Sequence, residues 1–263
     1  MTTLSCCLCV PFLLGAGGDY LTTLDPRAGP LFRNERLREM MDWATFRLTF
    51  DHDSLVPDMA AGEYKFGVEG QPQFAEGVSG RALVAGEGSG QGLYPREGNA
   101  PLETRGAISL WICPVGWTRQ QGGNTTFLMT SNASFYLQRQ GPMHNDEGVV
   151  TRYEGLQFLM LSQRTGNQCL MLDTSKWQAG QWRLVVAQWS WPTMSLSLDG
   201  GEFTSVSVKQ NPTAAEFGAL LVGADGGELT LIDELTIYRR PLTLPEVRLL
   251  YETLKPPAAE GSQ

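Results

Sequence analysis

The sequence predicts an all-β fold, an antiparallel sandwich of two β-sheets with a short C-terminal helix and a short helix in an N-terminal arm. Short segments of alternating apolar and polar residues recur along the chain, and a spacing of about 8 to 12 residues is typical of sandwich strands. Thirty glycines and fifteen prolines supply the turns that many short strands need. With 263 residues, the chain is long enough for one large domain of this kind.

The clearest strand covers residues 228–238. Leu229, Leu231, Asp233, Leu235 and Ile237 fall on one face of it. Because the other four side chains are apolar, we expect this face to point into the core and Asp233 to be at least half buried. A buried carboxyl group must be ionised against a partner, hydrogen-bonded or neutral, so we expect backbone N–H groups, an arginine or a metal ion beside Asp233.

A helix follows this strand. Thr243 and Glu246 stand at the two positions of a capping box, in which each side chain bonds the backbone of the other residue. Leu242 and Val247 occupy the positions of a hydrophobic staple. These signals together predict a helix over residues 244–254.

The first 43 residues are expected to form an arm. Residues 4–18 are apolar and small, and they are too few to span a membrane. They resemble the apolar region of an export signal, although no lysine or arginine precedes them, so a divergent export signal and a structural arm both stay open. Asn34 is placed to cap a short surface helix. We expect the domain itself to cover residues 44–255 and a flexible tail to cover residues 256–263.

Further strands follow between the arm and the closing strand. The first clear one is at residues 45–50, and a second is at residues 107–114. We expect Trp111 in the second of these, and Trp182 in a later strand, to be core residues. The remaining strands are predicted near residues 126–130, 134–138, 156–161, 169–172, 181–189, 194–198 and 217–223. The polar stretch at residues 142–148 is expected to be a loop.

Several of these segments resemble the laminin-G-like, concanavalin A-like jelly-roll family. The matching stretches are residues 50–51 (F-D), 74–83 (F-x-x-G-x-x-G-x-A-L), 108–114 (I-S-x-W-I-x-P), 180–182 (G-x-W), 196–200 (L-x-L-D-G), 232–234 (I-D-E) and 240–251 (R-x-L-T-x-x-E to L-Y). The resemblance covers residues 44–254 and implies a jelly roll in which the opening strand lies near the closing strand. It does not fix a function, because the family includes lectins, enzymes and adhesive modules.

The charge and the cysteines bear on the class of protein. A formal net charge of −8 argues against a nucleic-acid binder, which normally carries a basic surface. Cys113 and Cys169 are the two cysteines of the predicted domain, and they could pair across the sandwich or remain buried free thiols. No spacing of cysteine and histidine is that of a zinc site.

Motifs that would indicate catalysis are absent from the sequence. Enzymes of the resembling family that cut β-glucans carry an E-x-D-x-x-E pattern, whose alternation puts two carboxylates on one face of a strand. The chain has no such pattern, and the adjacent residues Asp233 and Glu234 would point to opposite faces. We therefore expect a non-catalytic binding module whose ligand is a carbohydrate. The alternatives are a glycoside hydrolase or lyase of the same fold, and an adhesion domain that binds protein.

The candidate ligand-binding residues are Trp117, Trp189 and Trp191. They stand at strand ends or in loops, where an indole ring can be exposed and can stack on a sugar. Packing in the core is the alternative for each of them. The resemblance also implies a structural Ca²⁺ held by Asp51, Asp233 and backbone carbonyls, with hydrogen bonds from backbone N–H groups or an arginine pair as the alternative for Asp233.

The expected partners are a glycan or an extracellular or cell-surface protein, with no nucleic acid and no transmembrane span. Two glycosylation sequons, at Asn124 and Asn132, agree with an extracellular or cell-surface location. A cytoplasmic location is the alternative, and the sequence leaves the oligomeric state open.

Overall fold

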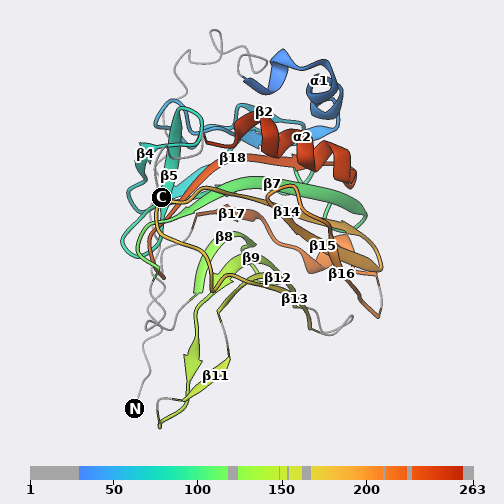
Figure 1. Ribbon diagram of the computed structural model, residues 1–263. Helices are drawn as coiled ribbons and strands as arrows, with labels where there is room; N and C mark the ends of the chain where they lie inside the picture. The colour runs from blue at the N-terminus through green and yellow to red at the C-terminus, as the bar shows by residue number, and fades with distance from the viewer. Residues whose placement is uncertain are drawn as a thin grey trace, which may run out of the picture.

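Two antiparallel sheets lie face to face in the computed structural model, and this confirms the predicted sandwich (Figure 1). The structure describes residues 30–117, 124–147, 149–152, 154–161, 167–209, 211–223 and 227–256. The predicted export signal lies outside these residues, as does almost all of the predicted tail. Among the described residues, no helix is long and apolar enough to cross a membrane.

The first sheet, sheet A, has the order β16-β15-β14-β7-β18-β1-β2, and β5 joins β4 to the side of β18. Its strands are β1 (Ala44–Leu48), β2 (Met59–Ala60), β4 (Gln73–Glu76), β5 (Arg81–Ala85), β7 (Arg105–Pro114), β14 (Arg183–Ser190), β15 (Thr193–Leu198), β16 (Thr204–Ser207) and β18 (Thr230–Tyr238). The opening strand β1 pairs with the closing strand β18, with Phe46 opposite Ile237, as the family resemblance implied.

The second sheet, sheet B, has the order β13-β12-β9-β8-β17-β6-β3. Its strands are β3 (Gly67–Glu69), β6 (Gln91–Tyr94), β8 (Asn124–Thr130), β9 (Phe135–Gln140), β12 (Gly155–Met160), β13 (Gln168–Asp173) and β17 (Leu220–Val222). A short hairpin of β10 (Met143–His144) and β11 (Val150–Arg152) projects away from the sandwich (Figure 1). The prediction of a plain loop at residues 142–148 was wrong in this respect, because a strand of two residues is too short to show alternation.

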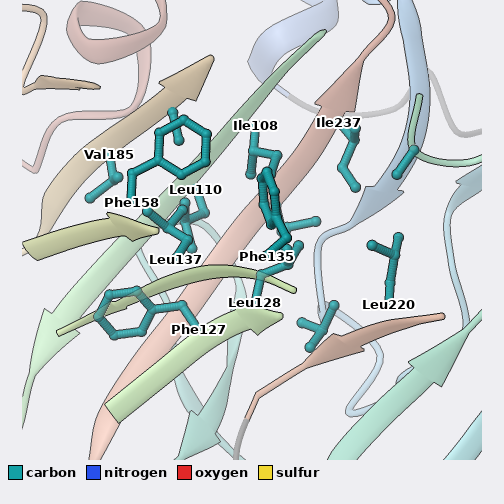
Figure 2. Close-up of a cluster of buried hydrophobic side chains, with 14 of the residues drawn as sticks. Ile108, Leu110, Phe127, Leu128, Phe135, Leu137, Phe158, Val185, Leu220 and Ile237 are labelled. Atoms are coloured by element: carbon teal, nitrogen blue, oxygen red, sulfur yellow. The ribbon is translucent and has the colours of Figure 1, made fainter. Parts of the chain in front are cut away.

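The main hydrophobic core lies between the two sheets. Leu110 and Val185 of sheet A face Leu137 and Phe158 of sheet B, and all four side chains are fully buried (Figure 2). Each of these residues alternates with a neighbour that points to the opposite face of its own sheet. The core is therefore built by side chains from strands that are far apart in the sequence.

A second hydrophobic cluster covers the outer face of sheet A. Helices η2 (Pro30–Arg33), α1 (Glu35–Met41) and α2 (Leu244–Leu254) contribute to it, and α2 lies across β18 in Figure 1. Trp111 is 1% exposed in this cluster, and its ring stacks on Tyr251 with centroids 5.8 Å apart. Trp111 is thus a core residue as predicted, whereas Trp182 is only partly buried at the margin of the same cluster.

Both predicted helices form with the expected caps. The side chain of Asn34 accepts a hydrogen bond from the N–H of Arg36 at 3.0 Å. At the start of α2, the N–H of Thr243 donates to Glu246 Oε2 at 2.7 Å, and the capping box is complete. A further 3-10 turn, η3 (Ala214–Glu216), precedes β17.

The inward face of β18 differs from the prediction. Ile232, Leu235 and Ile237 lie in the core between the sheets, whereas Leu229 is 40% exposed. The pairing of β18 with β7 shifts register after Asp233, and Glu234 has a φ of 50°. A bulge of this kind inserts one residue, so side chains before it point to the face opposite to the one expected. The prediction of one uninterrupted apolar face was wrong, and Asp233 points to the outer side of sheet A.

Cys113 and Cys169 do not form a disulfide with each other. Cys113 is buried, as the free-thiol interpretation predicted, but Cys169 on β13 is exposed.

Candidate functional site

The three tryptophans that the sequence predicts to bind a ligand lie at opposite ends of the sandwich. Strand β14 runs beside β7 over eight residues, a length of about 25 Å at roughly 3.3 Å per residue. Trp117 follows the last residue of β7 at one end of this pair, while Trp189 and Trp191 lie at the other end. The three rings therefore cannot line one binding site.

Trp189 belongs to the core. Its side chain is 1% exposed, its ring meets Phe135 edge to face at 5.6 Å, and its Nε1 donates to the carbonyl of Pro101 at 3.2 Å. A ring buried to this extent offers no face to a sugar, so the structure corrects the prediction for Trp189. Trp191 is partly buried against the core, and its Nε1 donates to the carbonyl of Leu102 at 2.8 Å. A ligand at Trp191 stays a prediction.

Two loops meet at the end of the sandwich that carries Trp117. One loop leaves β7 after Pro114, and the other joins β13 to β14 and carries Trp177. The N–H of Gly180 in the second loop donates to the carbonyl of Pro114 at 2.8 Å. This hydrogen bond between backbone groups holds the two loops together. We refer to the side chains gathered here as the aromatic end site, and they are Trp117, Arg139, Glu154, Trp177, Arg183 and Glu228.

The two tryptophans of the aromatic end site stack on each other. Their ring centroids are 5.6 Å apart and their planes differ by 12°. Trp117 is also nearly parallel to the buried ring of Phe127, and its Nε1 donates to Thr230 Oγ1 at 2.7 Å. Trp117 is therefore fixed on the core side, and Trp177 is the outer ring of the stack. Both rings are partly exposed.

Two arginines flank this stack. The guanidinium carbon of Arg139 lies 4.8 Å from the Trp117 ring centroid, and that of Arg183 lies 5.7 Å from the Trp177 ring centroid. The Arg139 side chain is fully buried and forms ion pairs with Glu154, at 3.0 Å, and with Glu228. Its charge is therefore compensated inside the protein, as a buried charge must be. Arg183 pairs with Asp199 at 2.7 Å but keeps 28% of its side chain exposed, so it can reach a ligand.

The two predicted metal ligands come together at another place, on the outer side of sheet A. Asp233 is fully buried, and its carboxylate accepts hydrogen bonds from the N–H of Ser79 at 3.0 Å and of Glu234 at 2.7 Å. Asp51 accepts from the N–H of Arg81 at 3.0 Å. One loop, residues 77–81, thus bonds both carboxylates. The prediction that Asp233 is at least half buried is confirmed, and the bonds that its carboxylate makes here are to backbone N–H groups.

The glycines of this loop allow the carboxylates of Asp51 and Asp233 to approach the loop backbone closely. A Cβ added at Gly77 would collide with Asp233 Oδ2, and one added at Gly80 would collide with Asp51 Oδ1. Gly80 also has a φ of 64°, a conformation that favours glycine. The motif that the sequence shares with the family at residues 74–83 therefore has a local steric reason in this chain.

The electrostatics at Asp233 are unfavourable for an ionised carboxylate without a cation. Burial is the largest cause and the charge of Glu234 the second, and together they raise the pKa of Asp233 to about 9. Glu234 is itself compensated by Arg47, whose Nη2 lies 2.9 Å from Glu234 Oε2 while both side chains are almost fully buried. Asp233 is held instead by neutral backbone N–H groups, so a cation bound beside it would lower its pKa.

The fit of Asp51 and Asp233 to a hard cation is partial. No group of three or more histidine, cysteine, aspartate or glutamate side chains placed to hold a metal occurs in the described part of the chain. Ca²⁺ accepts six to eight oxygens, including backbone carbonyls, and each carboxylate oxygen has two lone pairs. Asp51 and Asp233 would therefore have to be completed by carbonyl groups of the neighbouring loops.

Sequence reasoning missed Arg139 and Trp177. Arg139 follows Phe135 and Leu137 at intervals of two residues, so the alternation of β9 places a charged side chain on a core face. The same signal that singled out Asp233 could have found it. Trp177 lies in a turn after Asp173, whose Oδ1 accepts from the N–H of Ser175 at 2.8 Å. An aromatic residue in such a polar turn was the available signal.

Similar proteins point to one superfamily. Residues 86–248 match the family described as the concanavalin A-like lectin/glucanases superfamily. A search of curated proteins gave no match. The solved structure of the botulinum neurotoxin serotype D binding domain is similar in fold, with a TM-score of 0.65 and 13% identity over 81% of this chain and 52% of that one.

Two other structures of botulinum neurotoxins are similar to the same degree. One concerns the cell entry of type C, which depends upon interaction with two ganglioside molecules, and has a TM-score of 0.65 and 15% identity over 83% of this chain and 53% of that one. The other, the binding domain of type DC in complex with rat synaptotagmin II, has a TM-score of 0.64 and 14% identity over 82% and 52%. This chain spans about half the length of these structures, and at such identities the likeness concerns the fold. Since the family match covers more than half of the sequence, the chain belongs to the concanavalin A-like lectin/glucanase superfamily.

Proposed function

We propose that this protein is a non-catalytic binding module that takes a carbohydrate at the aromatic end site. The observation that carries the proposal is the stack of Trp117 and Trp177, which is partly exposed and has the Arg183 guanidinium beside its outer ring. Sugars present C–H faces that pack on aromatic rings and hydroxyl groups that bond to planar polar groups. The aromatic end site offers both kinds of group on two loops that are bonded to each other.

The similar structures support a carbohydrate ligand for this architecture. Botulinum neurotoxin type C interacts with two ganglioside molecules, and the type DC binding domain has been solved in complex with SialylT. A complex with rat synaptotagmin II also occurs among them, so an adhesion domain that binds protein is the alternative from the same class.

The test is a glycan array probed with the wild-type protein, Trp177→Ala and the control Trp43→Ala. Trp43 is 39% exposed and lies next to Ala44, which pairs with Tyr238 at the end of β18. Trp117 bonds Thr230 at the start of β18, so Trp43 is distant from the aromatic end site. Trp177→Ala should weaken binding of every glycan that the wild type retains by about tenfold or more, since loss of an aromatic stacking partner costs roughly 1 to 2 kcal/mol. Trp43→Ala should bind as the wild type does. Glycans bound equally by all three proteins would place the site elsewhere, and silence on all glycans would favour the protein-binding alternative.

A glycoside hydrolase is the second candidate, and Glu154 with Glu228 is the observation that favours it. The two carboxylates bond different nitrogens of the Arg139 guanidinium, which lies over the Trp117 ring. Most glycoside hydrolases use a pair of carboxylates, one of which must be protonated to act as the acid. Arg139 forms an ion pair with each of the two glutamates, which favours a structural role for both carboxylates. Release of reducing ends from bound glycans, lost in both Glu154→Gln and Glu228→Gln, would replace the binding proposal by this one.

We also propose a structural Ca²⁺ at Asp51 and Asp233. The raised pKa of Asp233 and the convergence of both carboxylates on residues 77–81 support it. The proposed role of this cation is structural. Because it would bind the folded state alone, it would shift the unfolding equilibrium toward the folded protein. Melting curves recorded with chelator and with excess calcium should differ, and coincident curves would exclude the site.

An extracellular or cell-surface location follows from a glycan or surface-protein partner. The similarity in fold to a toxin whose cell entry depends upon gangliosides supports such a location. Mass spectrometry of the natural protein tests it, because an intact Met1 in the cytosolic fraction would contradict export.

A further inference from the structure

Several exposed apolar side chains lie in one stretch of the chain, between β1 and β4. Eight large hydrophobic residues are exposed in the described part of the chain, and four of them, Val56, Tyr64, Phe66 and Val68, lie within 13 residues of sequence. Their exposed fractions range from 38% to 48%. Single exposed apolar residues are ordinary on a protein surface, but a group of four marks a contact surface.

Two of them, Phe66 and Val68, border an open cleft between the edges of the two sheets. The cleft has a volume of about 340 Å³. Its lining comes from the loop after β1, from β3 of sheet B and from the start of β4 in sheet A, and consists of Asp53, Ser54, Leu55, Phe66, Val68, Pro72 and Phe74. It lies at the β3 edge of sheet B, and three strands, β8, β17 and β6, separate β3 from β9, which carries Arg139 of the aromatic end site.

The floor of the cleft is fixed to the core. The ring of Phe66 stacks on that of Tyr94 at 6.1 Å, and Tyr94 in turn meets Phe46 edge to face at 4.9 Å. The hydroxyl of Tyr94 donates to the carbonyl of Leu55 at 2.7 Å, which ties the opposite wall to the same ring. The cleft is therefore preformed, so a ligand would not have to order these side chains on binding.

Strand β3 adds a backbone edge to this apolar lining. It pairs with β6 on one side, with Val68 opposite Gly92, and it ends the order of sheet B among the described residues. An edge strand has N–H and C=O groups that can pair with an added strand. Phe66 and Val68 are two residues apart, so an added strand could bring alternate side chains into the same cleft.

The surroundings of the cleft are acidic. Residues 51–81 contain six acidic and two basic residues, and so carry about half of the chain's net charge of −8. The two basic residues are already paired, Arg81 with Asp53 at 2.7 Å and Lys65 with Glu63 at 2.8 Å. The unbalanced carboxylates favour a partner that is positively charged next to its apolar residues.

We propose that this cleft binds an extended peptide segment of a partner protein, with apolar side chains at alternate positions and lysine or arginine at its ends. The segment adds to sheet B as a strand beside β3 and places its apolar side chains against Phe66 and Val68. This interaction is separate from the carbohydrate site of the preceding section and does not depend on it.

The probe is a short fluorescein-labelled peptide in which valine and threonine alternate between terminal lysines, and binding is measured by fluorescence polarisation. Val68→Lys should weaken binding roughly tenfold, because it puts a like charge in the apolar cleft. Val149→Lys is the matched control, an exposed valine beyond β10, and it should bind as the wild type does. Val68→Thr, which keeps a strand-forming residue, serves if Val68→Lys does not fold. Trp177→Ala should leave peptide binding unchanged, which separates this test from that of the carbohydrate site.

Two control peptides test the chemistry of the partner. A peptide with the same composition but with its valines in one block should bind more weakly, because alternate residues no longer face the cleft. A peptide with terminal glutamates should also bind more weakly, and added salt should reduce the difference by screening the charges.

Four outcomes would overturn the proposal. They are no binding of the alternating peptide, equal binding of the lysine and glutamate peptides, equal binding by wild type and Val68→Lys, and a dimer in sedimentation equilibrium that Val68→Lys dissociates. The last would assign the cleft to a second copy of this chain.

Discussion

Replacing Asp233 by asparagine should change the way the stability of this protein depends on pH. Burial and the neighbouring charge of Glu234 raise the pKa of Asp233 to about 9 in the folded protein, against about 3.9 in the unfolded chain. Between these two values the folded protein binds one proton more than the unfolded chain does. The free energy of unfolding therefore falls as the pH rises, by up to about 1.4 kcal/mol per pH unit from this group alone.

The assay is urea unfolding of wild type and Asp233→Asn in chelator at pH 5 to pH 8. Asparagine has the shape of aspartate but does not titrate in this range, so groups common to both proteins cancel in the difference. Wild type should lose up to about 4 kcal/mol relative to Asp233→Asn between pH 5 and pH 8, and the full penalty is reached only above the folded pKa. The variant also loses one backbone hydrogen bond, because its amide N–H₂ cannot accept from Ser79 or Glu234.

Calcium provides the second half of this experiment. A bound cation favours the ionised carboxylate, so excess calcium should flatten the pH dependence of wild type and leave Asp233→Asn unchanged. Parallel unfolding curves for the two proteins in chelator would refute the raised pKa of Asp233. A wild-type pH dependence that calcium does not alter would refute the metal site while leaving the raised pKa in place.

Three further predictions concern stability and accessibility. Arg47→Met should lower the free energy of unfolding in urea by about 3 to 5 kcal/mol, because it leaves the buried Glu234 carboxylate without its partner. Combining Arg47→Met with Glu234→Gln should recover part of this stability. A double variant no more stable than Arg47→Met would contradict the charge argument. Gly80→Ala should lower the free energy of unfolding by clearly more than the ~1 kcal/mol expected for Gly88→Ala. Both glycines have a positive φ, but only a Cβ added at Gly80 would collide with Asp51. Equal losses for the two variants would show that Asp51 moves freely. Alkylation of the native protein should label the exposed Cys169 and spare Cys113, and peptide mapping would identify the labelled residue. The Cys113 thiol is buried and has a pKa raised to about 11. Labelling of both cysteines at equal rates would mean that β7 opens readily.

Much of the fold was predictable because it depends on local periodicity. The capping box of Thr243 and Glu246 and the N-cap of Asn34 act within a few residues, so their geometry follows from the sequence spacing. The alternation of the strands, together with the motifs shared with the family, also predicted which segments pair as the opening and closing strands. A single inserted residue at Glu234 was enough to reverse the predicted face before it, because alternation carries no information about where a bulge occurs.

The candidate site was predictable only in part. The sequence identified Trp117 as a ring near a strand end. The family resemblance paired Asp51 with Asp233, and the structure brings that pair to one loop. The burial of Trp189 and the stacking of Trp177 on Trp117 were decided by tertiary structure, since each depends on which strand lies opposite and on how two distant loops meet.

What the sequence by itself determined about this protein is its class of fold, its helix boundaries and the presence of a carboxylate that needs a partner. These features follow from interactions between residues that are close in the chain, and such interactions can be recognised from the spacing of residues along the sequence. Only the tertiary structure decided that Arg139 compensates two glutamates beneath a tryptophan, and that Phe66 and Val68 border an open cleft beside β3, the last strand of sheet B among the described residues. Both depend on the packing of residues from opposite sheets, and that packing is set by the register of strands far apart in the sequence rather than by any local pattern.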